Sequence, residues 1–362
     1  MKVLILKPSS LGDVVHALPV ARLLKLQFPQ AEIHWWILRG LMPLLETDPD
    51  LDVLHPFDRE GWSNPSVWMS AASGLSAMRR SRYEWVIDLQ GLFRSGLMSW
   101  LAEGELTLGL DDHGEGARGF YDVTLTRPSA TTHAVDYNLT VCRALNIPVD
   151  RPFEWLPRRP RVAETVAKQL GRLGSGKVIA IQPGARWETK RWPIAFFVEL
   201  ARRLQSELGE VRLLILGGAN ERGLSGMISR ASIPGCHDLA GTLSLPELVE
   251  WIRLCDLLIT NDTGPMHLGA AMDVPTLALF GPTTPWRTGP YGQMDRVLSQ
   301  ATPCAPCFQG VCNNAIDLAC LRGISPERVA QRAIEILEAP RRSSPWAARS
   351  SSANFEAAPG EA

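Results

Sequence analysis

The sequence lacks two features that would point to a membrane or to a nucleic acid. None of its apolar runs reaches the roughly 18–20 residues that a helix needs to cross a bilayer. Charge of neither sign is in excess, because 37 Lys and Arg residues oppose 38 Asp and Glu residues and leave a formal net charge of −1. No global basic field would therefore draw the chain to nucleic acid or to an anionic membrane. We expect a protein without membrane spans and without a nucleic-acid partner.

The N-terminal segment has a charged residue followed by a short apolar run, which is also the layout of a secretory signal. Here the apolar run after Lys2 is too short, and Lys7 and Asp13 interrupt the segment. A buried first strand fits better, so we expect a cytoplasmic protein.

The length of 362 residues is enough for two domains that each bury a core. Hydrophobic residues make up 45% and charged residues 21%, which is ordinary for a soluble enzyme. A Pro- and Arg-rich stretch near the middle suggests a linker, and the Ser-, Ala- and Pro-rich end suggests a disordered tail. The expected divisions are a first domain at 1–150, a linker at 151–161, a second domain at 162–339 and a tail at 340–362.

Strands and helices are expected to alternate in both halves. Residues 2–7 form an apolar run followed by helical spacing over 14–26, and residues 178–181 precede an amphipathic helix over 193–208. Alternation of this kind predicts an α/β fold with parallel sheets, and ligands then bind at the carboxyl ends of the strands.

Two tight turns follow apolar strands and open helices. The first is Ser-Ser-Leu-Gly-Asp at 9–13, and the second is Asn-Asp-Thr-Gly-Pro at 261–265. Backbone N–H groups at a helix N-terminus favour a phosphate. Two such units suggest two nucleotide-binding halves that face each other across a cleft.

Asp13 is the first candidate for chemistry. A carboxylate in the first turn of a helix is stabilised in its ionised form, so it could take a proton from an attacking hydroxyl. The alternative, an ordinary acidic residue at a helix start, is equally compatible with the local sequence. His16 lies one turn further and could point into the same cleft, although a surface or core histidine is the simpler interpretation.

Lys190 lies in a basic loop, residues 184–193, between an expected strand and an expected helix. A lysine at the mouth of the cleft can neutralise charge on a departing diphosphate. A solvated basic loop is the alternative.

The Asp262-Thr263-Gly264 turn is followed by His267 one helical turn later. Asp-Thr-Gly also occurs in aspartic proteases, but those are all-β and use two catalytic aspartates. In an α/β chain with one such triplet, a phosphate-facing turn fits better, because Gly264 permits close approach of a ligand to the backbone. A helix start with a satisfied histidine is the alternative.

Four of the 7 cysteines are close in sequence, with the spacing C-x2-C-x4-C-x7-C. They are Cys304, Cys307, Cys312 and Cys320. Four thiolates could hold zinc or an iron–sulfur cluster. Because the last two do not form a second C-x2-C pair, a structural loop without metal is the favoured interpretation.

Together these motifs resemble the ADP-heptose:lipopolysaccharide heptosyltransferases of glycosyltransferase family 9. The resemblance covers roughly residues 1–335. It rests on KPSSLGDVVHALP at 7–19, DLQGLFRSG at 88–96, PGARWETKRWP at 183–193, LGGANE at 216–221, NDTGPMHLGAA at 261–271 and FGPT at 280–283.

The resemblance implies a GT-B fold, in which two Rossmann-like domains with parallel sheets face each other across the active site. The N-terminal domain would take the acceptor and the C-terminal domain the nucleotide-sugar. The opening motif looks most like heptosyltransferase I, which transfers heptose from ADP-heptose to Kdo–lipid A. The cysteine loop looks more like other branches, including heptosyltransferase II. A lipid A acceptor also implies a peripheral enzyme at the inner leaflet of the inner membrane.

The resemblance also assigns roles to individual residues. Asp13 matches the general base and Lys190 the lysine that contacts the donor phosphates. The implied donor-binding residues are Arg186, Glu221, Asp262, Thr263, Gly264 and His267. The candidates for the acceptor are Ser10, Gly12, His16, Arg94, Arg118 and His133. No metal or other cofactor is implied, since the Asp-x-Asp letters within 48–52 lie in the half that should not hold the donor.

Three other functions remain open from the sequence. They are a GT-B transferase with a different nucleotide-sugar, a nucleotide-sugar epimerase of similar fold, and a non-catalytic module built around the cysteines.

Overall fold

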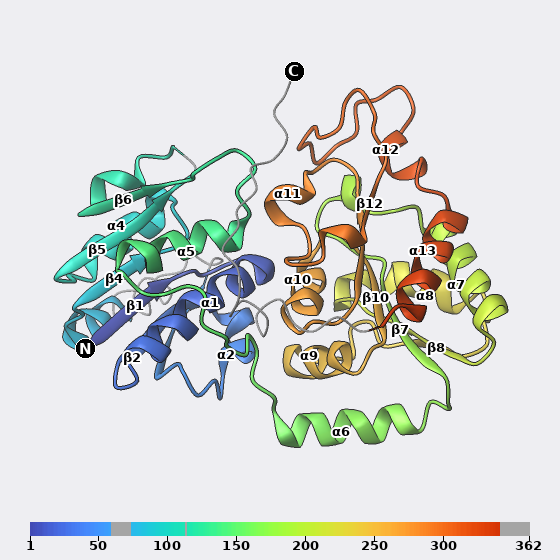
Figure 1. Cartoon of the computed structure of the whole chain (residues 1–362), viewed down its shortest axis with the longest axis horizontal. Helices are drawn as coiled ribbons and strands as arrows, with labels where there is room; N and C mark the ends of the chain where they lie inside the picture. The colour runs from blue at the N-terminus through green and yellow to red at the C-terminus, as the bar shows by residue number, and fades with distance from the viewer. Residues whose placement is uncertain (59–73, 113, 341–362) are drawn as a thin grey trace.

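The computed structural model describes residues 1–58, 74–112 and 114–340, and these form two α/β domains side by side (Figure 1). Each domain is built around a six-stranded sheet in which every described pairing is parallel. The predicted α/β class with parallel sheets is confirmed. Among the described residues, no helix is both long enough and apolar enough to span a bilayer.

The sheet of the N-terminal domain has the order β3-β2-β1-β4-β5-β6. Its strands are β1 (Lys2–Leu6), β2 (Glu32–Leu38), β3 (Val53–Phe57), β4 (Trp85–Asp88), β5 (Leu106–Asp111) and β6 (Val123–Thr126). Val3 to Leu6 of β1 are wholly buried, as the continuous apolar run requires of a strand covered on both faces. The helical segments are α1 (Leu11–Gln27), η1 (Arg39–Leu41), α2 (Met42–Leu45), α4 (Phe93–Leu101), η2 (Ala117–Phe120) and α5 (Ala134–Ala144).

The sheet of the C-terminal domain has the order β12-β11-β10-β7-β8-β9. Its strands are β7 (Lys177–Gln182), β8 (Val211–Ile215), β9 (Cys236–Asp238), β10 (Leu257–Asn261), β11 (Thr276–Phe280) and β12 (Val297–Ser299). The helical segments are α6 (Pro160–Gly171), η3 (Glu188–Lys190), α7 (Ile194–Leu208), η4 (Ala219–Glu221), α8 (Arg222–Ser229), α9 (Leu245–Arg253), α10 (Gly264–Ala271), α11 (Pro285–Thr288), η5 (Met294–Arg296), α12 (Ala319–Arg322) and α13 (Pro326–Glu338).

The strand order reverses once in each sheet. The two positions of reversal indicate where a ligand-binding site is expected. In the N-terminal sheet β1 lies between β2 and β4, and in the C-terminal sheet β7 pairs with β10. Ligands in open α/β sheets bind beyond the carboxyl ends of the strands at such reversals. The segments that leave these ends carry the 9–13 turn, the 184–193 loop and the 261–265 turn.

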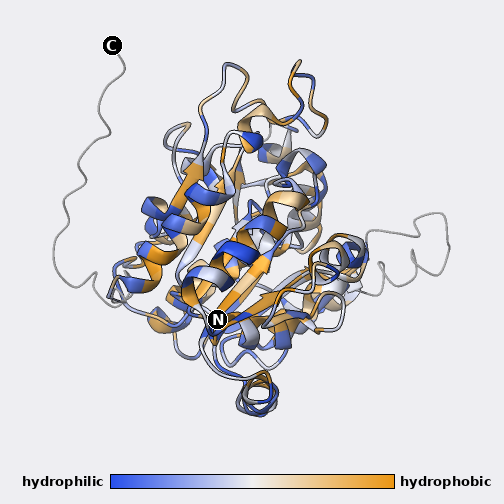
Figure 2. Ribbon diagram, turned by 90° about the vertical axis from the view of Figure 1, so that its right-hand side faces the viewer, coloured by the Kyte–Doolittle hydropathy of each residue, from blue (hydrophilic) through white to orange (hydrophobic). Residues whose placement is uncertain are grey.

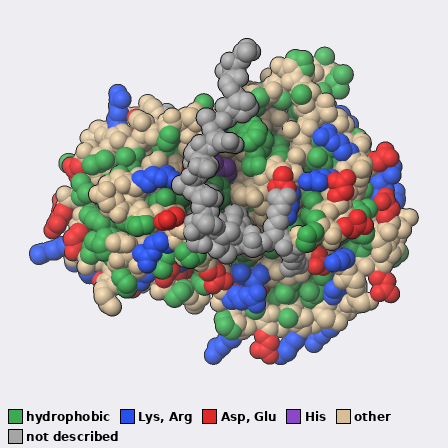
Figure 3. Space-filling view, viewed as in Figure 1, with side chains coloured by type: hydrophobic (Ala, Val, Ile, Leu, Met, Phe, Trp, Pro, Cys, Tyr) green, Lys and Arg blue, Asp and Glu red, His purple; other side chains and the backbone are tan. Residues whose placement is uncertain are grey.

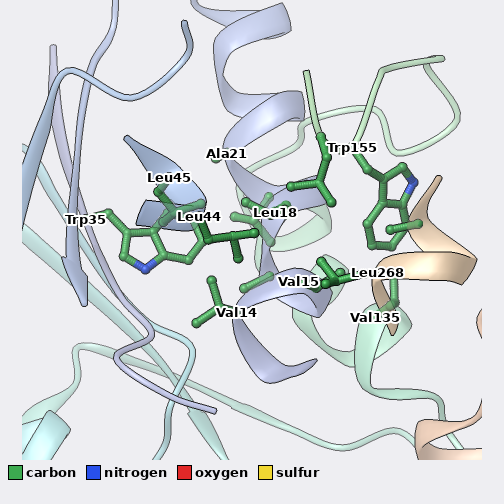
Figure 4. Packing of buried hydrophobic residues seen from close by; sticks show 14 of the residues in the cluster. Val14, Val15, Leu18, Ala21, Trp35, Leu44, Leu45, Val135, Trp155 and Leu268 are labelled. Carbon is green, nitrogen blue, oxygen red and sulfur yellow. The ribbon is translucent and has the colours of Figure 1, made fainter. Parts of the chain in front are cut away.

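Helix α1 packs against both domains. Val14 and Leu18 face Trp35 of the N-terminal domain, whereas Val15 lies near Leu268 of α10 in the C-terminal domain (Figure 4). These residues belong to one buried apolar cluster that continues across the boundary. Figure 2 shows the apolar strands inside the molecule, with the polar faces of helices outside. The two domains therefore share part of their hydrophobic core.

The segment expected to be a linker packs against its surroundings. Arg159 donates to the carbonyl of Leu44 at 2.5 Å, and the ring of Trp155 is buried in the shared core. Helix α6 begins at Pro160, inside the predicted linker of 151–161. The predicted tail lies outside the described residues except for residue 340.

Candidate active site

Two cavities meet at Asp13. The central cavity, of about 290 Å³, lies between the domains; its lining includes Lys7 and Gln90 from the N-terminal domain and Lys190 from the C-terminal domain. The side cavity, of about 220 Å³, is lined mainly by the N-terminal domain and includes Gln90 and Arg186. Figure 3 shows Lys, Arg, Asp and Glu side chains interspersed over the visible surface of both domains.

Asp13 is held by the turn that precedes it. Its Oδ2 accepts hydrogen bonds from the backbone N–H of Ser10 at 2.8 Å and from the Ser10 hydroxyl at 2.7 Å, which form a capping box at the start of α1. Burial alone would raise the pKa of Asp13, but the charge of Lys7 and the two bonds from Ser10 outweigh it and lower the pKa. Asp13 is therefore a carboxylate at neutral pH, as a base for a sugar hydroxyl must be.

Lys190 faces the cleft from the other domain. Its Nζ lies 2.6 Å from Oδ2 of Asp262, which also accepts from the hydroxyl of Thr283 at 2.7 Å. The Trp187 ring packs 4.9 Å from Nζ and limits the directions that the ammonium can take. Thr263 is the N-cap of α10, so the first N–H groups of that helix lie next to the ion pair. A cation and a helix N-terminus together suit a diphosphate.

Three histidines meet where α1, α5 and α10 converge. The Nε2 of His16 and the Nδ1 of His267 share a hydrogen bond of 2.9 Å across the domain boundary, and the His133 ring lies 5.3 Å from that of His16. The Nε2 of His133 donates to the carbonyl of Gly289 at 3.1 Å, while its Nδ1 accepts from the N–H of Val135. The histidines thus connect the domains beside Asp13.

The comparisons with known proteins agree with this geometry. Residues 73–316 match the family described as glycosyltransferase family 9 (heptosyltransferase). The chain belongs to glycosyltransferase family 9.

Curated relatives of this family 9 enzyme extend over nearly the whole chain. It is 30% identical to lipopolysaccharide heptosyltransferase 1 of Pseudomonas aeruginosa, over 94% of this chain and 99% of the relative. It is 28% identical to lipopolysaccharide heptosyltransferase 2 of Salmonella typhimurium, over 83% of this chain and 89% of the relative. The resemblance seen in the motifs is confirmed, and the protein is a glycosyltransferase.

Solved structures show the same fold. The ADP-heptose lps heptosyltransferase II of E. coli superposes with a TM-score of 0.74 at 24% identity, covering 93% of this chain and 98% of that one. The E. coli heptosyltransferase WaaC with ADP gives a TM-score of 0.73 at 23% identity, covering 93% and 100%. The predicted GT-B fold is confirmed.

The remaining predicted residues of the family 9 site fall in different places. Arg186, Arg94 and Ser10 line the side cavity. The Glu221 carboxylate accepts from the N–H of Gly218 at 2.8 Å and lies outside the lining of both cavities. Arg118 is exposed on η2 and is likewise absent from both linings. Their roles as donor or acceptor contacts stay predictions.

Sequence reasoning missed several residues that line the central cavity. Lys7, Asp112, Arg127 and Arg287 are charged, and Gln90 is polar. Asp112 accepts two hydrogen bonds from Arg127 and one from Arg287, the last at 3.0 Å from the opposite domain. A usable signal existed for two of them: Lys7 and Gln90 directly follow apolar runs that form central strands.

The cysteine loop borders the family 9 active site. Cys304, Cys307, Cys312 and Cys320 all line a third cavity, of about 310 Å³. The loop is fixed to the Lys190 segment by a 2.7 Å hydrogen bond from the Thr189 hydroxyl to the carbonyl of Gln309, and Phe308 reaches the central cavity. Within the described part of the chain, no three His, Cys, Asp or Glu side chains are grouped so that they could hold a metal ion.

Gly12→Ala should weaken the contact between the domains and lower turnover. A Cβ at Gly12 would overlap the His267 ring, which must then move away from α1. Gly223→Ala is the matched control, because a Cβ at that helical position meets nothing within 4 Å and should stabilise the protein by about 0.5–1 kcal/mol. Kinetics and thermal unfolding of both variants would test this, and equal behaviour would contradict the close packing.

Acidification should destabilise the histidine contact. Burial lowers the pKa of His133 to about 4, and burial followed by the charge of His267 lowers that of His16. In the unfolded chain, a histidine takes up a proton near pH 6.5. The stability that comes from burying these histidines in the neutral form is therefore complete above that pH and is lost as the pH falls towards the folded-state pKa. The loss of free energy of unfolding is at most about 1.4 kcal/mol per pH unit for each histidine.

The measurement is the free energy of unfolding between pH 7.5 and 5. His133→Gln should show a shallower dependence on pH than the wild type. If the two slopes were the same, burial of a neutral His133 would not contribute to the stability of the interface.

Proposed function

We propose that the enzyme transfers heptose from ADP-heptose to the Kdo residue of Kdo–lipid A in the inner core of lipopolysaccharide, as a heptosyltransferase I. The observation that carries the proposal is an ionised Asp13 at the junction of two cavities, with Lys190 on the opposite domain. The Pseudomonas aeruginosa relative, which bears the name heptosyltransferase 1, supports the assignment over 94% of this chain.

Asp13 acts as the general base. Its carboxylate removes the proton from the acceptor hydroxyl, and the oxygen forms a bond to the anomeric carbon of the donor as the bond from that carbon to ADP breaks. Attack from the face opposite ADP inverts the anomeric centre. The transition state resembles an oxocarbenium ion, and a single carboxylate suffices because no covalent glycosyl-enzyme forms.

Lys190 and the N-terminus of α10 stabilise the leaving diphosphate. As negative charge builds on the bridging oxygen, the Lys190 ammonium exchanges part of its contact with Asp262 for a contact with the phosphate. Thr263 and Gly264 offer backbone N–H groups at the helix start. The further donor contacts in this proposal are Arg186, Glu221 and His267. Closure of the domains would exclude water and limit hydrolysis of the donor.

The acceptor would enter from the N-terminal domain. Ser10 and Arg94 line the side cavity there, Gly12 follows in the same turn, and Arg118 could extend the contact at the surface. His16 and His133 are buried with ring nitrogens in use between the domains, so contact with an acceptor would require these hydrogen bonds to exchange.

A lipid A acceptor would bring the enzyme to the inner face of the inner membrane. Helix α4 exposes Phe93 by 50% and Trp100 by 60%, and Arg94 follows Phe93. Aromatic side chains beside a cation suit the interface between water and lipid. We propose a cytoplasmic enzyme that touches the membrane peripherally through this region.

Heptosyltransferase II is the second candidate. The Salmonella relative named heptosyltransferase 2 is 28% identical, close to the 30% of the heptosyltransferase 1 relative, and the cysteine loop looks more like that branch.

Purified enzyme should be supplied with ADP-heptose and either Kdo–lipid A or heptosylated Kdo–lipid A. Product from the first acceptor alone would support heptosyltransferase I. Product from the second alone would move the assignment to heptosyltransferase II. A parallel assay with UDP-sugars would detect a different donor, and product from none of these pairs would refute both candidates.

A further inference from the structure

The floor of the central cavity holds polar groups with unused hydrogen-bonding capacity. Lys7 is only 8% exposed, and in the described chain its Nζ has one acceptor, the carbonyl of Leu89 at 2.6 Å. Among the residues that the structure describes, the buried Oε1 of Gln90 and the buried Nδ1 of His16 have no hydrogen-bond partner. An ammonium has three donors, so two N–H groups of Lys7 remain for a ligand.

The nearby carboxylates do not use this capacity. Oδ2 of Asp13 is bonded to Ser10, and the oxygens of Asp112 are bonded to Arg127 and Arg287. The oxygens of Asp88 accept from the N–H groups of Gln90 and Gly91 and from the hydroxyl of Tyr121. These carboxylates act on Lys7 through the Coulomb interaction and not through a hydrogen bond among the described residues. A buried ammonium with unmade hydrogen bonds is costly, so such a group is expected where a ligand completes its contacts.

The position of Lys7 distinguishes the two reactants. Lys7 follows β1 and Gln90 follows β4, two neighbouring strands at the reversal point of the N-terminal sheet. Lys190 and the start of α10, which suit the donor diphosphate, belong to the other domain. Lys7 therefore lies on the N-terminal wall of the central cavity, whereas Lys190 lines it from the C-terminal domain.

We propose that Lys7 binds the carboxylate of an acidic acceptor sugar, beside the hydroxyl that Asp13 deprotonates. Gln90 Oε1 accepts from a neighbouring hydroxyl of the same sugar. This inference rests on the proposed function, since it takes the N-terminal wall of the central cavity, next to Asp13, as part of the acceptor site. A carboxylate fits because the cavity lining carries four cations (Lys7, Arg127, Lys190 and Arg287) against two anions (Asp13 and Asp112), and Lys7 is the cation among them that has no carboxylate hydrogen bond.

The test combines an enzyme variant with a substrate variant. Transfer from ADP-heptose is measured with a Kdo-terminated acceptor and with the same acceptor after reduction of the Kdo carboxyl group to a primary alcohol. In the wild type, the reduction should lower kcat/KM by about 10–100-fold, mainly through KM, as expected for a charge-assisted hydrogen bond. Lys7→Met should lose about as much with the acidic acceptor and should barely distinguish the two acceptors.

Controls separate this contact from the effect of Lys7 on Asp13. All rates are taken on the pH-independent plateau of each variant. Lys25→Met, which removes an ammonium from the far end of α1, should keep the wild-type preference for the carboxylate. If Lys7→Met does not fold, Lys7→Gln replaces it, because its amide can still donate to the carbonyl of Leu89.

The outcomes distinguish the inference from the proposed function. If the neutral Lys7 variant prefers the carboxylate as strongly as the wild type does, Lys7 does not bind it. If the wild type uses both acceptors equally, the carboxylate is not recognised. Transfer to neither acceptor would instead overturn the proposed function.

Discussion

Asp13→Asn should lower kcat by about 10²–10⁴ while leaving the affinity for the donor nearly unchanged. The amide keeps the shape of the carboxylate and can still accept the hydrogen bonds of Ser10, but it cannot take a proton from the acceptor hydroxyl. Donor affinity should persist because the proposed diphosphate contacts belong to the opposite domain. The measurement is steady-state turnover together with binding of ADP or of the donor.

Asp13 also stabilises the start of α1, so a control must remove this structural contribution. Glu247 provides it, because its Oε2 accepts from the N–H and hydroxyl of Ser244 in the same capping-box arrangement at the start of α9. Glu247→Gln should cost roughly 1 kcal/mol of stability at most and leave kcat intact. Wild-type turnover of Asp13→Asn would show that Asp13 is not the base, whereas an equal loss in both variants would indicate a defect of folding.

The pKa of Asp13 gives this prediction a second readout. Because the pKa lies below its ordinary value, near 3.9, Asp13 stays ionised at every pH above that value. The wild-type rate should therefore show no acid limb from Asp13 between about pH 5 and 8. A limb in that window that vanished in Asp13→Asn would mean that the pKa is raised instead.

The sequence was informative where structure is local. A strand, a tight turn and a helix are adjacent in the chain, so the positions of Asp13, Lys190 and Asp262 at the carboxyl ends of strands followed from the order of residues. Lys190 forms an ion pair with Asp262, and it lines the central cavity together with Asp13. The segments that carry these three residues therefore face one cleft.

Contacts between the halves could not be predicted in this way. His133, a predicted acceptor contact, bonds to Gly289, which lies 156 positions away, and this bond could not be foreseen. Arg287 and Asp112 meet from opposite domains over 175 positions. Which distant segments meet depends on how α1, α5 and α10 pack, and no local pattern encodes this. Trp155, in the segment expected to be a linker, likewise has partners in both domains, Arg22 and Tyr291.

Lys190→Met should lower kcat/KM by about 10²–10³, the effect of removing one donor aimed at developing negative charge. It should also reduce stability by about 1–3 kcal/mol, because Asp262 would stay buried with one less partner, the hydroxyl of Thr283 remaining. Glu188→Gln on the same short helix is the control; that side chain is 87% exposed and should affect neither property.

The two effects of Lys190 can be separated with a second substitution. Adding Asp262→Asn to Lys190→Met removes the unpaired charge and should restore much of the stability, yet the leaving diphosphate would still lack its cation. Activity should therefore remain low in the double variant while the free energy of unfolding recovers. If activity recovered with stability, Lys190 would act only as the partner of Asp262, and the charge on the diphosphate would have to be met by the helix N-terminus and Arg186.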